Sequence, residues 1–150
     1  MITNPEPLFS APHIYTIDSA YYLEDVLNPY TRKTIIKKIE AKLAQHQFDA
    51  IAFRGLSGAL VAPIVALHMD KTLLCIRKEE SSHSDSNVEG DIAARSYIIL
   101  DDFVCSGSTV KAIQEAVTKV APQAKCLGIY QYRWDSFLTN EEFDLYCQGE

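Results

Sequence analysis

Two adjacent acids, Asp101 and Asp102, stand between an apolar run and a turn of small residues. The turn at residues 105–109 reads CSGST, and the backbone N–H groups and hydroxyls of such a turn can bind a phosphate at a helix N-terminus. Carboxylates accept hydrogen bonds from vicinal hydroxyls and can help to position a divalent metal. Because the acids would repel a bare phosphate, the pattern favours a sugar phosphate. An acid pair of this kind can also simply cap a helix.

Two further clusters bring positive charge to places where strands are expected to end. The first is FRGLSG at residues 53–58, in which the glycines allow the backbone to approach an oxyanion closely and Arg54 adds charge. The second is the pair Arg77 and Lys78, which ends the run KTLLCIR and precedes a long polar segment. Taken alone, the first cluster could be an ordinary turn and the second a solvated strand edge.

The segments around these clusters alternate between strands and helices. Short apolar runs predict strands at residues 49–53, 71–77, 96–100 and 126–132. Apolar residues at helical spacing predict helices that begin at Pro29, follow Gly58 and span residues 110–120. This alternation implies an α/β fold with a mostly parallel, twisted sheet flanked by helices. The strand carboxyl ends then share one edge, which makes neighbours of the loops at Arg54, Lys78, Asp101 and Arg133.

Length and composition restrict the classes of protein to which the chain can belong. Its 150 residues, 47% of them hydrophobic and 23% charged, suit one globular domain and leave no room for a second core. No apolar leader or membrane-length stretch is found, which predicts a soluble, cytoplasmic protein. The net charge of -6 argues against nucleic-acid binding. The four cysteines show no CxxC spacing and predict reduced thiols rather than a zinc site or disulfides.

The motif at residues 97–109, YIILDDFVCSGST, resembles the phosphoribosyl pyrophosphate (PRPP) signature of type I phosphoribosyltransferases. It has that signature's four apolar residues, two acids, two apolar residues and small Ser/Thr/Gly loop, and it lacks the spacing of a nucleotide P-loop or a dinucleotide fold. FRGLSG is similar to the pyrophosphate loop of the same family, and the resemblance spans residues 48–134. It implies one domain with a core at about residues 30–134, a small hood from residues 1–29 and 135–150, and a mobile loop at 78–95.

The resemblance also implies an activity and a set of site residues. The implied activity is the Mg²⁺-dependent transfer of the 5-phosphoribosyl group from PRPP to a nucleobase, with release of pyrophosphate. Asp101 and Asp102 are the implied catalytic residues, which hold the ribose hydroxyls and Mg²⁺ directly or through water. The residues implied to bind the 5-phosphate are Cys105, Ser106, Gly107, Ser108 and Thr109. Those implied to bind pyrophosphate are Arg54, Gly55, Leu56, Ser57, Arg77 and Lys78.

A purine is the favoured acceptor, which would place the protein in nucleotide salvage. Hypoxanthine- and guanine-type relatives usually have Asp where this chain has Cys105, so the chain resembles the adenine, xanthine and orotate types more closely. Tyr132 and Trp134 offer aromatic faces on which a base could stack, although Trp134 could equally be a core residue. A carboxylate of the mobile loop, from Glu79, Glu80 or Glu89, could assist proton transfer at the base. Relatives are usually dimers, which implies a homodimer.

Two other functions fit the same sequence. A PRPP-sensing regulator or binding module would keep the sugar-phosphate site without catalysing a transfer. An unrelated doubly wound domain could use the acid pair to bind Mg²⁺ for phosphoryl chemistry, although that function leaves FRGLSG without a role.

Overall fold

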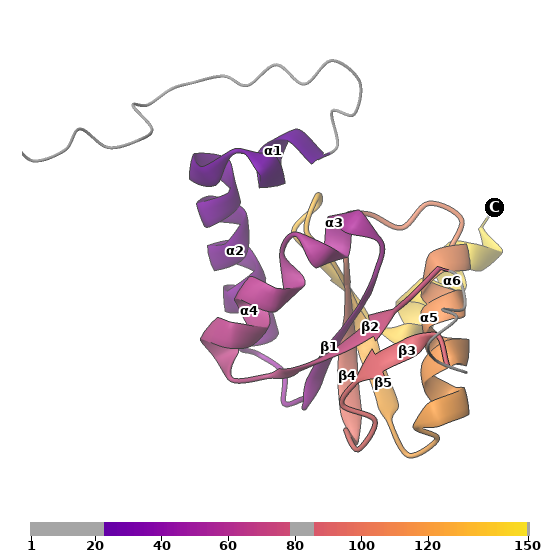
Figure 1. Cartoon of the computed structure of the whole chain (residues 1–150). Coiled ribbons are helices and arrows are strands. Elements are labelled where there is room, and N and C mark those ends of the chain that lie inside the picture. Colours follow the sequence, from indigo (N-terminus) through magenta and orange to yellow (C-terminus); the bar gives the residue numbers. More distant parts are fainter. Residues whose placement is uncertain (1–22, 79–85, 150) are drawn as a thin grey trace, which may run out of the picture.

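A mixed six-stranded sheet, in the order β3-β2-β1-β4-β5-β6, forms the centre of the protein. The computed structural model describes residues 23–78 and 86–149 (Figure 1). Strands β1, β2, β4 and β5 run parallel, and the edge strands β3 and β6 are antiparallel to their neighbours. The strands are β1 (Ala50–Arg54), β2 (Thr72–Ile76), β3 (Val88–Gly90), β4 (Ser96–Asp101), β5 (Lys125–Gln131) and β6 (Ser136–Leu138).

Helices cover both faces of this sheet. Figure 1 shows α2 and α4 on one side and α5 and α6 on the other, which gives three layers. The helices are α1 (Glu24–Leu27), α2 (Pro29–Leu43), α3 (Leu56–Ala59), α4 (Ala62–Met69), α5 (Ser108–Val120) and α6 (Asn140–Gln148). The predicted α/β class, with a mostly parallel sheet flanked by helices, is therefore confirmed.

Side-chain alternation along the strands divides the core into two apolar layers. In β1, Ile51 and Phe53 pack toward α2 and α4, whereas Ala50 and Ala52 pack toward α5. Five of the six residues of β4 are buried, as expected for a central strand covered on both faces. The helix predicted after Asn28 also forms, because the Asn28 side chain accepts the N–H of Tyr30 at 3.0 Å and Pro29 occupies the first turn.

The order of the strands creates a crevice at one edge of the sheet. β1 lies between β2 and β4 and runs parallel to both, so the chain leaves β1 toward one side and leaves β4 toward the other. At such a switch point the loops that follow the two strands separate, which leaves space for a ligand outside their carboxyl ends. The loop that begins at Gly55 and the loop that begins at Asp102 face each other there.

Two short edge strands lie in segments that the sequence assigned to a loop and a hood. Residues 88–90, inside the predicted loop at 78–95, form β3 and pair with β2. Residues 136–138, inside the predicted hood at 135–150, form β6 and pair with β5. Each strand has only three residues, too few to show the alternation that identifies a strand in a sequence. Residues 1–22 of the hood predicted at 1–29 and 135–150 lie outside the described residues, as do Glu79 and Glu80 of the loop.

No helix within residues 23–78 and 86–149 is both long enough and apolar enough to cross a membrane.

Gly90 should be essential for the attachment of β3. Its φ is 127°, and a Cβ added there would lie 1.9 Å from the carbonyl oxygen of Leu73 in the neighbouring strand. We expect Gly90→Ala to lower the free energy of unfolding by about 3 kcal/mol, because both the backbone and β2 must shift. Urea denaturation measures this change. Gly149→Ala is the control, since a Cβ there comes no closer than 3.7 Å to its neighbours. Equal stability of the two variants would contradict the close approach at Gly90.

Candidate functional site

A cavity of about 460 Å³ lies at the switch point between β1 and β4. Its walls come from the loops after β1, β2 and β4, and Leu23 adds an apolar side chain ahead of α1. The lining residues of these loops are Arg54, Gly55, Leu56, Ser57, Lys78 and the continuous segment 101–110. The structure thus brings together almost all the site residues that the sequence predicted.

The loop after β1 supplies positive charge and a stretch of backbone that a ligand in the cavity could approach closely. Gly55 has a φ of 85°, a conformation that favours glycine, and a Cβ at this position would lie 3.4 Å from Cε of Lys78. The Nε atom of Arg54 is buried and has no hydrogen-bond partner within the described part of the chain. A buried guanidinium N–H without a protein acceptor is a donor that a bound anion can satisfy. This loop therefore suits an oxyanion.

The two acids lie at the base of the cavity and are almost completely buried. Asp101 is 7% exposed and Asp102 is 6% exposed. Oδ1 of Asp101 accepts hydrogen bonds from Oγ of Ser57 at 3.0 Å and from the N–H of Asp102 at 2.9 Å. Oδ1 of Asp102 accepts the N–H of Phe103 at 2.9 Å. Burial, followed by the neighbouring Asp102, raises the pKa of Asp101 to about 7. Asp101 can therefore hold a proton near neutral pH, and the two carboxyl groups together offer oxygen atoms to a cation.

Tyr132 fixes the position of the loop after β1 from the end of β5. Its hydroxyl donates to the carbonyl oxygen of Ser57 at 3.0 Å, and its N–H donates to that of Asp101 at 3.0 Å. Burial and the two nearby carboxylates raise its pKa, which keeps the hydroxyl protonated as a donor. The sequence analysis offered Tyr132 as a ring on which a base could stack. In the structure this side chain is only 7% exposed, lies outside the cavity lining and joins the loops instead.

Trp134 lies outside the cavity lining and is 62% exposed. The Arg133 guanidinium lies 5.4 Å from its ring centroid and 5.5 Å from that of Phe103. Phe103 does line the cavity, and the sequence analysis gave it no role. Its position directly after the two acids was the available signal, since a large aromatic ring there must lie close to whatever the acids bind.

The segment Cys105, Ser106, Gly107, Ser108 and Thr109, here called the phosphate loop, lies entirely along the cavity. Gly107 adopts a φ of 82°, which turns the chain into α5 at Ser108. The Ser106 hydroxyl accepts the N–H of Ser108 at 3.3 Å and donates to the Ser108 hydroxyl at 3.0 Å. The loop therefore offers backbone N–H groups and hydroxyls at the N-terminus of a 13-residue helix, as a phosphate site requires.

Gln131 supports the start of the phosphate loop, and the sequence analysis did not identify it. This side chain is 7% exposed, and its Oε1 accepts the N–H of Val104 at 2.7 Å. The only signal in the sequence was a polar residue at the end of a strand that is otherwise buried. Such a residue needs a partner, but the sequence does not show which one.

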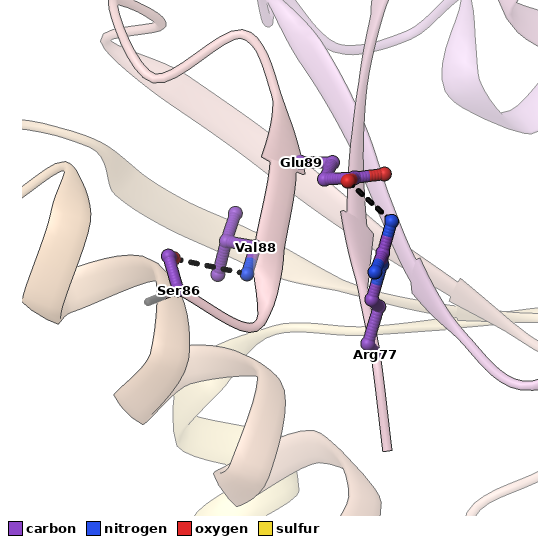
Figure 2. A network of polar contacts seen from close by, with 4 residues as sticks. All are labelled: Arg77, Ser86, Val88 and Glu89. Carbon is purple, nitrogen blue, oxygen red and sulfur yellow. Dashed lines mark hydrogen bonds and ion pairs between the residues drawn. The ribbon is translucent and has the colours of Figure 1, made fainter. Parts of the chain in front are cut away.

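The two basic residues after β2 have different positions. Lys78 lines the cavity beside Gly55, as predicted. Arg77 instead forms an ion pair with Glu89 of β3, as Figure 2 shows, and its N–H donates to the carbonyl oxygen of Asn87 at 2.7 Å. Arg77 thus stabilises the β2–β3 edge and is not part of the cavity lining. Glu89, which the sequence offered as a possible proton-transfer group, is occupied by the same ion pair.

A metal ion held by protein groups alone is not supported. Among residues 23–78 and 86–149 no group of three or more His, Cys, Asp or Glu side chains is placed to hold one. Asp101 and Asp102 supply hard oxygen atoms, which suit Mg²⁺, but an ion there would need further oxygens from water or from a ligand.

The comparison with curated proteins finds relatives of two specificities. An orotate phosphoribosyltransferase from Methanospirillum hungatei is 34% identical over 88 residues, which cover 57% of this chain and 51% of that protein. An adenine phosphoribosyltransferase from Bifidobacterium longum is 25% identical over 116 residues, which cover 65% of this chain and 60% of that protein. The chain therefore spans between half and three fifths of the length of these relatives. No protein-family model matches it.

The comparison with solved structures supports the fold. The adenine phosphoribosyltransferase of Saccharomyces cerevisiae, solved with an imino-altritol bisphosphate and adenine, matches with a TM-score of 0.60 and 22% identity. The match covers 71% of this chain and 70% of that structure. The described residues therefore have the fold of these transferases.

The burial of Asp101 should appear in the pH dependence of stability. In the folded protein the Asp101 carboxyl keeps its proton up to about pH 7, because its pKa is raised to about 7 from the 3.8 of an unperturbed aspartate. Between these values the folded state binds more protons than the unfolded state, so Asp101 contributes stability below pH 4 that is lost as the pH rises through 7. We expect Asp101→Asn, measured by urea denaturation with a chelator present, to gain about 2–4 kcal/mol relative to wild type between pH 4 and pH 8.

The exposed residue Asp144 provides the control for this measurement. Asp144→Asn removes an exposed carboxyl group and so controls for the loss of one negative charge. A pH-independent difference between Asp101→Asn and wild type would show that the Asp101 carboxyl titrates normally.

Proposed function

Because the chain carries motifs that resemble those of type I phosphoribosyltransferases and has the fold of such enzymes, we propose that it belongs to their family, transfers the 5-phosphoribosyl group of PRPP to a nucleobase and releases pyrophosphate. The observation that carries this proposal is the arrangement of one cavity, in which the loop after β1 and the phosphate loop flank two buried acids. PRPP has the same arrangement of groups, with a phosphate at one end, a pyrophosphate at the other and hydroxyls between them.

Each end of PRPP has a complementary set of protein groups. The phosphate loop would bind the 5-phosphate through its N–H groups and hydroxyls, and this remote binding energy would orient C1 for attack. The loop at Arg54–Ser57 and the ammonium of Lys78 would bind the pyrophosphate, whose developing charge they stabilise as it leaves. Asp101 and Asp102 would accept hydrogen bonds from the ribose hydroxyls and stabilise positive charge as it develops on the ribose.

Magnesium fits this site as an ion held jointly with the ligand. Mg²⁺ commonly keeps several waters and binds one or two carboxylates together with substrate phosphates. Two buried carboxylates in the same cavity as the loop after β1, which would bind the pyrophosphate, meet that description. When bound, the ion would neutralise charge on the pyrophosphate and so make it a better leaving group. Asp101 and Asp102 are the residues that would hold it, directly or through water.

The acceptor base is the least determined part of the reaction. The pairs Arg54-Gly55 and Arg77-Lys78 favour a purine by family resemblance. The curated relative of 34% identity, however, is named for orotate, and that of 25% identity is named for adenine. Phe103, which lines the cavity next to the acids, offers a ring on which a flat base could stack. Orotate and adenine are therefore the first acceptors to test, followed by hypoxanthine, guanine and xanthine.

The activity is tested by incubating the full chain with PRPP, Mg²⁺ and each base in turn. We expect pyrophosphate and one nucleoside monophosphate to form in equal amounts with a preferred base. The thermal unfolding temperature is measured in parallel with PRPP alone. Stabilisation by PRPP without turnover on any base would show that the protein is a PRPP-binding regulator and not an enzyme. If neither turnover nor stabilisation occurs, the proposed ligand is wrong.

The two basic residues after β2 should differ in their contribution. Lys78→Gln removes an ammonium from the cavity and should raise the KM for PRPP about tenfold. Arg77→Gln breaks the ion pair with Glu89 and should have a smaller effect on KM, together with a small loss of stability. Steady-state kinetics with the preferred base measure both. Lys119→Gln, at the far end of α5, is the control for a change of charge alone. A larger effect at Arg77 than at Lys78 would contradict the placement of these side chains.

A further inference from the structure

The C-terminal helix α6 lies directly behind the phosphate loop. Figure 1 shows α6 beside α5 on the same face of the sheet. A Cβ added to Gly107 would lie 2.8 Å from Sγ of Cys147 and 2.9 Å from Cζ of Phe143, both on α6. Phe143 is 2% exposed and packs in the same apolar layer as Val104 and Val110, on either side of the loop. The helix therefore forms the floor on which the phosphate loop rests.

One polar side chain of α6 contacts the loop backbone. The hydroxyl of Tyr146 lies 3.1 Å from the carbonyl oxygen of Val104 and 3.2 Å from that of Cys105, and it can donate to either. Tyr146 is not among the residues that line the cavity. It therefore contacts the backbone of this segment from outside the cavity.

These two contacts set the direction of two peptide groups. In a trans peptide the C=O and N–H bonds point in opposite directions. Because the carbonyls of Val104 and Cys105 face Tyr146, the N–H groups of Cys105 and Ser106 point away from α6. Both residues line the cavity, and neither N–H has an acceptor among the residues that the structure describes. Two backbone donors are thus left free on the side where an anion would bind.

We infer that Tyr146 is a positioning residue for phosphate recognition: by holding the carbonyls of Val104 and Cys105, it orients the N–H groups of Cys105 and Ser106 toward the 5-phosphate. Gln131 acts on the preceding peptide, where its Oε1 accepts the N–H of Val104 at 2.7 Å. The inference rests on the proposed function, since it assigns the oriented amides to the phosphate of a phosphoribosyl ligand. Preorganised donors of this kind bind an anion without having to reorient first.

The experiment compares wild type with Tyr146→Phe, which keeps the ring and removes only the hydroxyl. Isothermal titration calorimetry measures the binding of ribose 5-phosphate and, separately, of inorganic pyrophosphate. We expect Tyr146→Phe to weaken ribose 5-phosphate binding roughly five- to tenfold. Pyrophosphate binding, which uses the loop after β1, should change less than about twofold. With PRPP as substrate, KM should rise by the same factor as the ribose 5-phosphate affinity falls, while kcat stays within about twofold.

Tyr30→Phe provides a matched control, because Tyr30 is 45% exposed and Tyr146 is 44% exposed, and Tyr30 lies on α2 across the sheet from α6. It should bind both probes as wild type does. Equal affinity of wild type and Tyr146→Phe for ribose 5-phosphate would overturn the inference, and so would an equal loss for both probes, which indicates general loosening. In either case turnover by the wild type would leave the proposed function intact. A wild type that neither binds ribose 5-phosphate nor turns over PRPP would overturn both.

Discussion

The hydrogen bond from Ser57 to Asp101 joins the two loops on which the site depends. It spans 3.0 Å between the loop after β1 and the end of β4, which are adjacent parallel strands from which the chain diverges. Burying two neighbouring carboxylates is costly, and each needs donors to remain in place. Ser57, the N–H of Asp102 and the N–H of Phe103 supply them. Tyr132 then fixes Ser57 itself. These contacts tie together the two loops that line the cavity and fix their relative position.

The charges around the cavity suit one kind of ligand. A protein of net charge -6 attracts anions only where cationic side chains and amide N–H groups outweigh the acids. Arg54 and Lys78 provide positive charge at one end of the cavity, and the amide N–H groups at the N-terminus of α5 provide partial positive charge at the other. The acids in the middle favour hydroxyls or a metal ion. A ligand with anionic ends and a polyhydroxyl centre meets all three conditions, and a simple phosphate or a nucleic acid does not.

The sequence predicted those features that depend on local patterns. The four parallel strands, the helix that begins at Pro29 and the phosphate loop each follow from a short run of residues whose types are diagnostic. The edge strands β3 and β6 were missed because three residues carry no periodicity. Arg77 was grouped with Lys78 because the two are adjacent, but neighbouring residues on an extended chain point in opposite directions, and Arg77 meets Glu89. Gln131 contacts Val104, directly before the phosphate loop, from 27 residues away, and Tyr146 contacts Val104 and Cys105 from 41 or more residues away, so that no local pattern could identify them.

The most direct test of the account is to locate the two ends of the ligand on the protein. In ¹⁵N-labelled protein with assigned amide resonances, ribose 5-phosphate should shift the signals of residues 105–109 most strongly. These shifts should saturate as the ribose 5-phosphate concentration rises. Subsequent addition of pyrophosphate and Mg²⁺ should shift those of residues 54–57. Shifts that centre on any other surface, or a pyrophosphate that displaces ribose 5-phosphate from the phosphate loop without affecting residues 54–57, would contradict the central claim that one cavity binds both ends of a phosphoribosyl pyrophosphate.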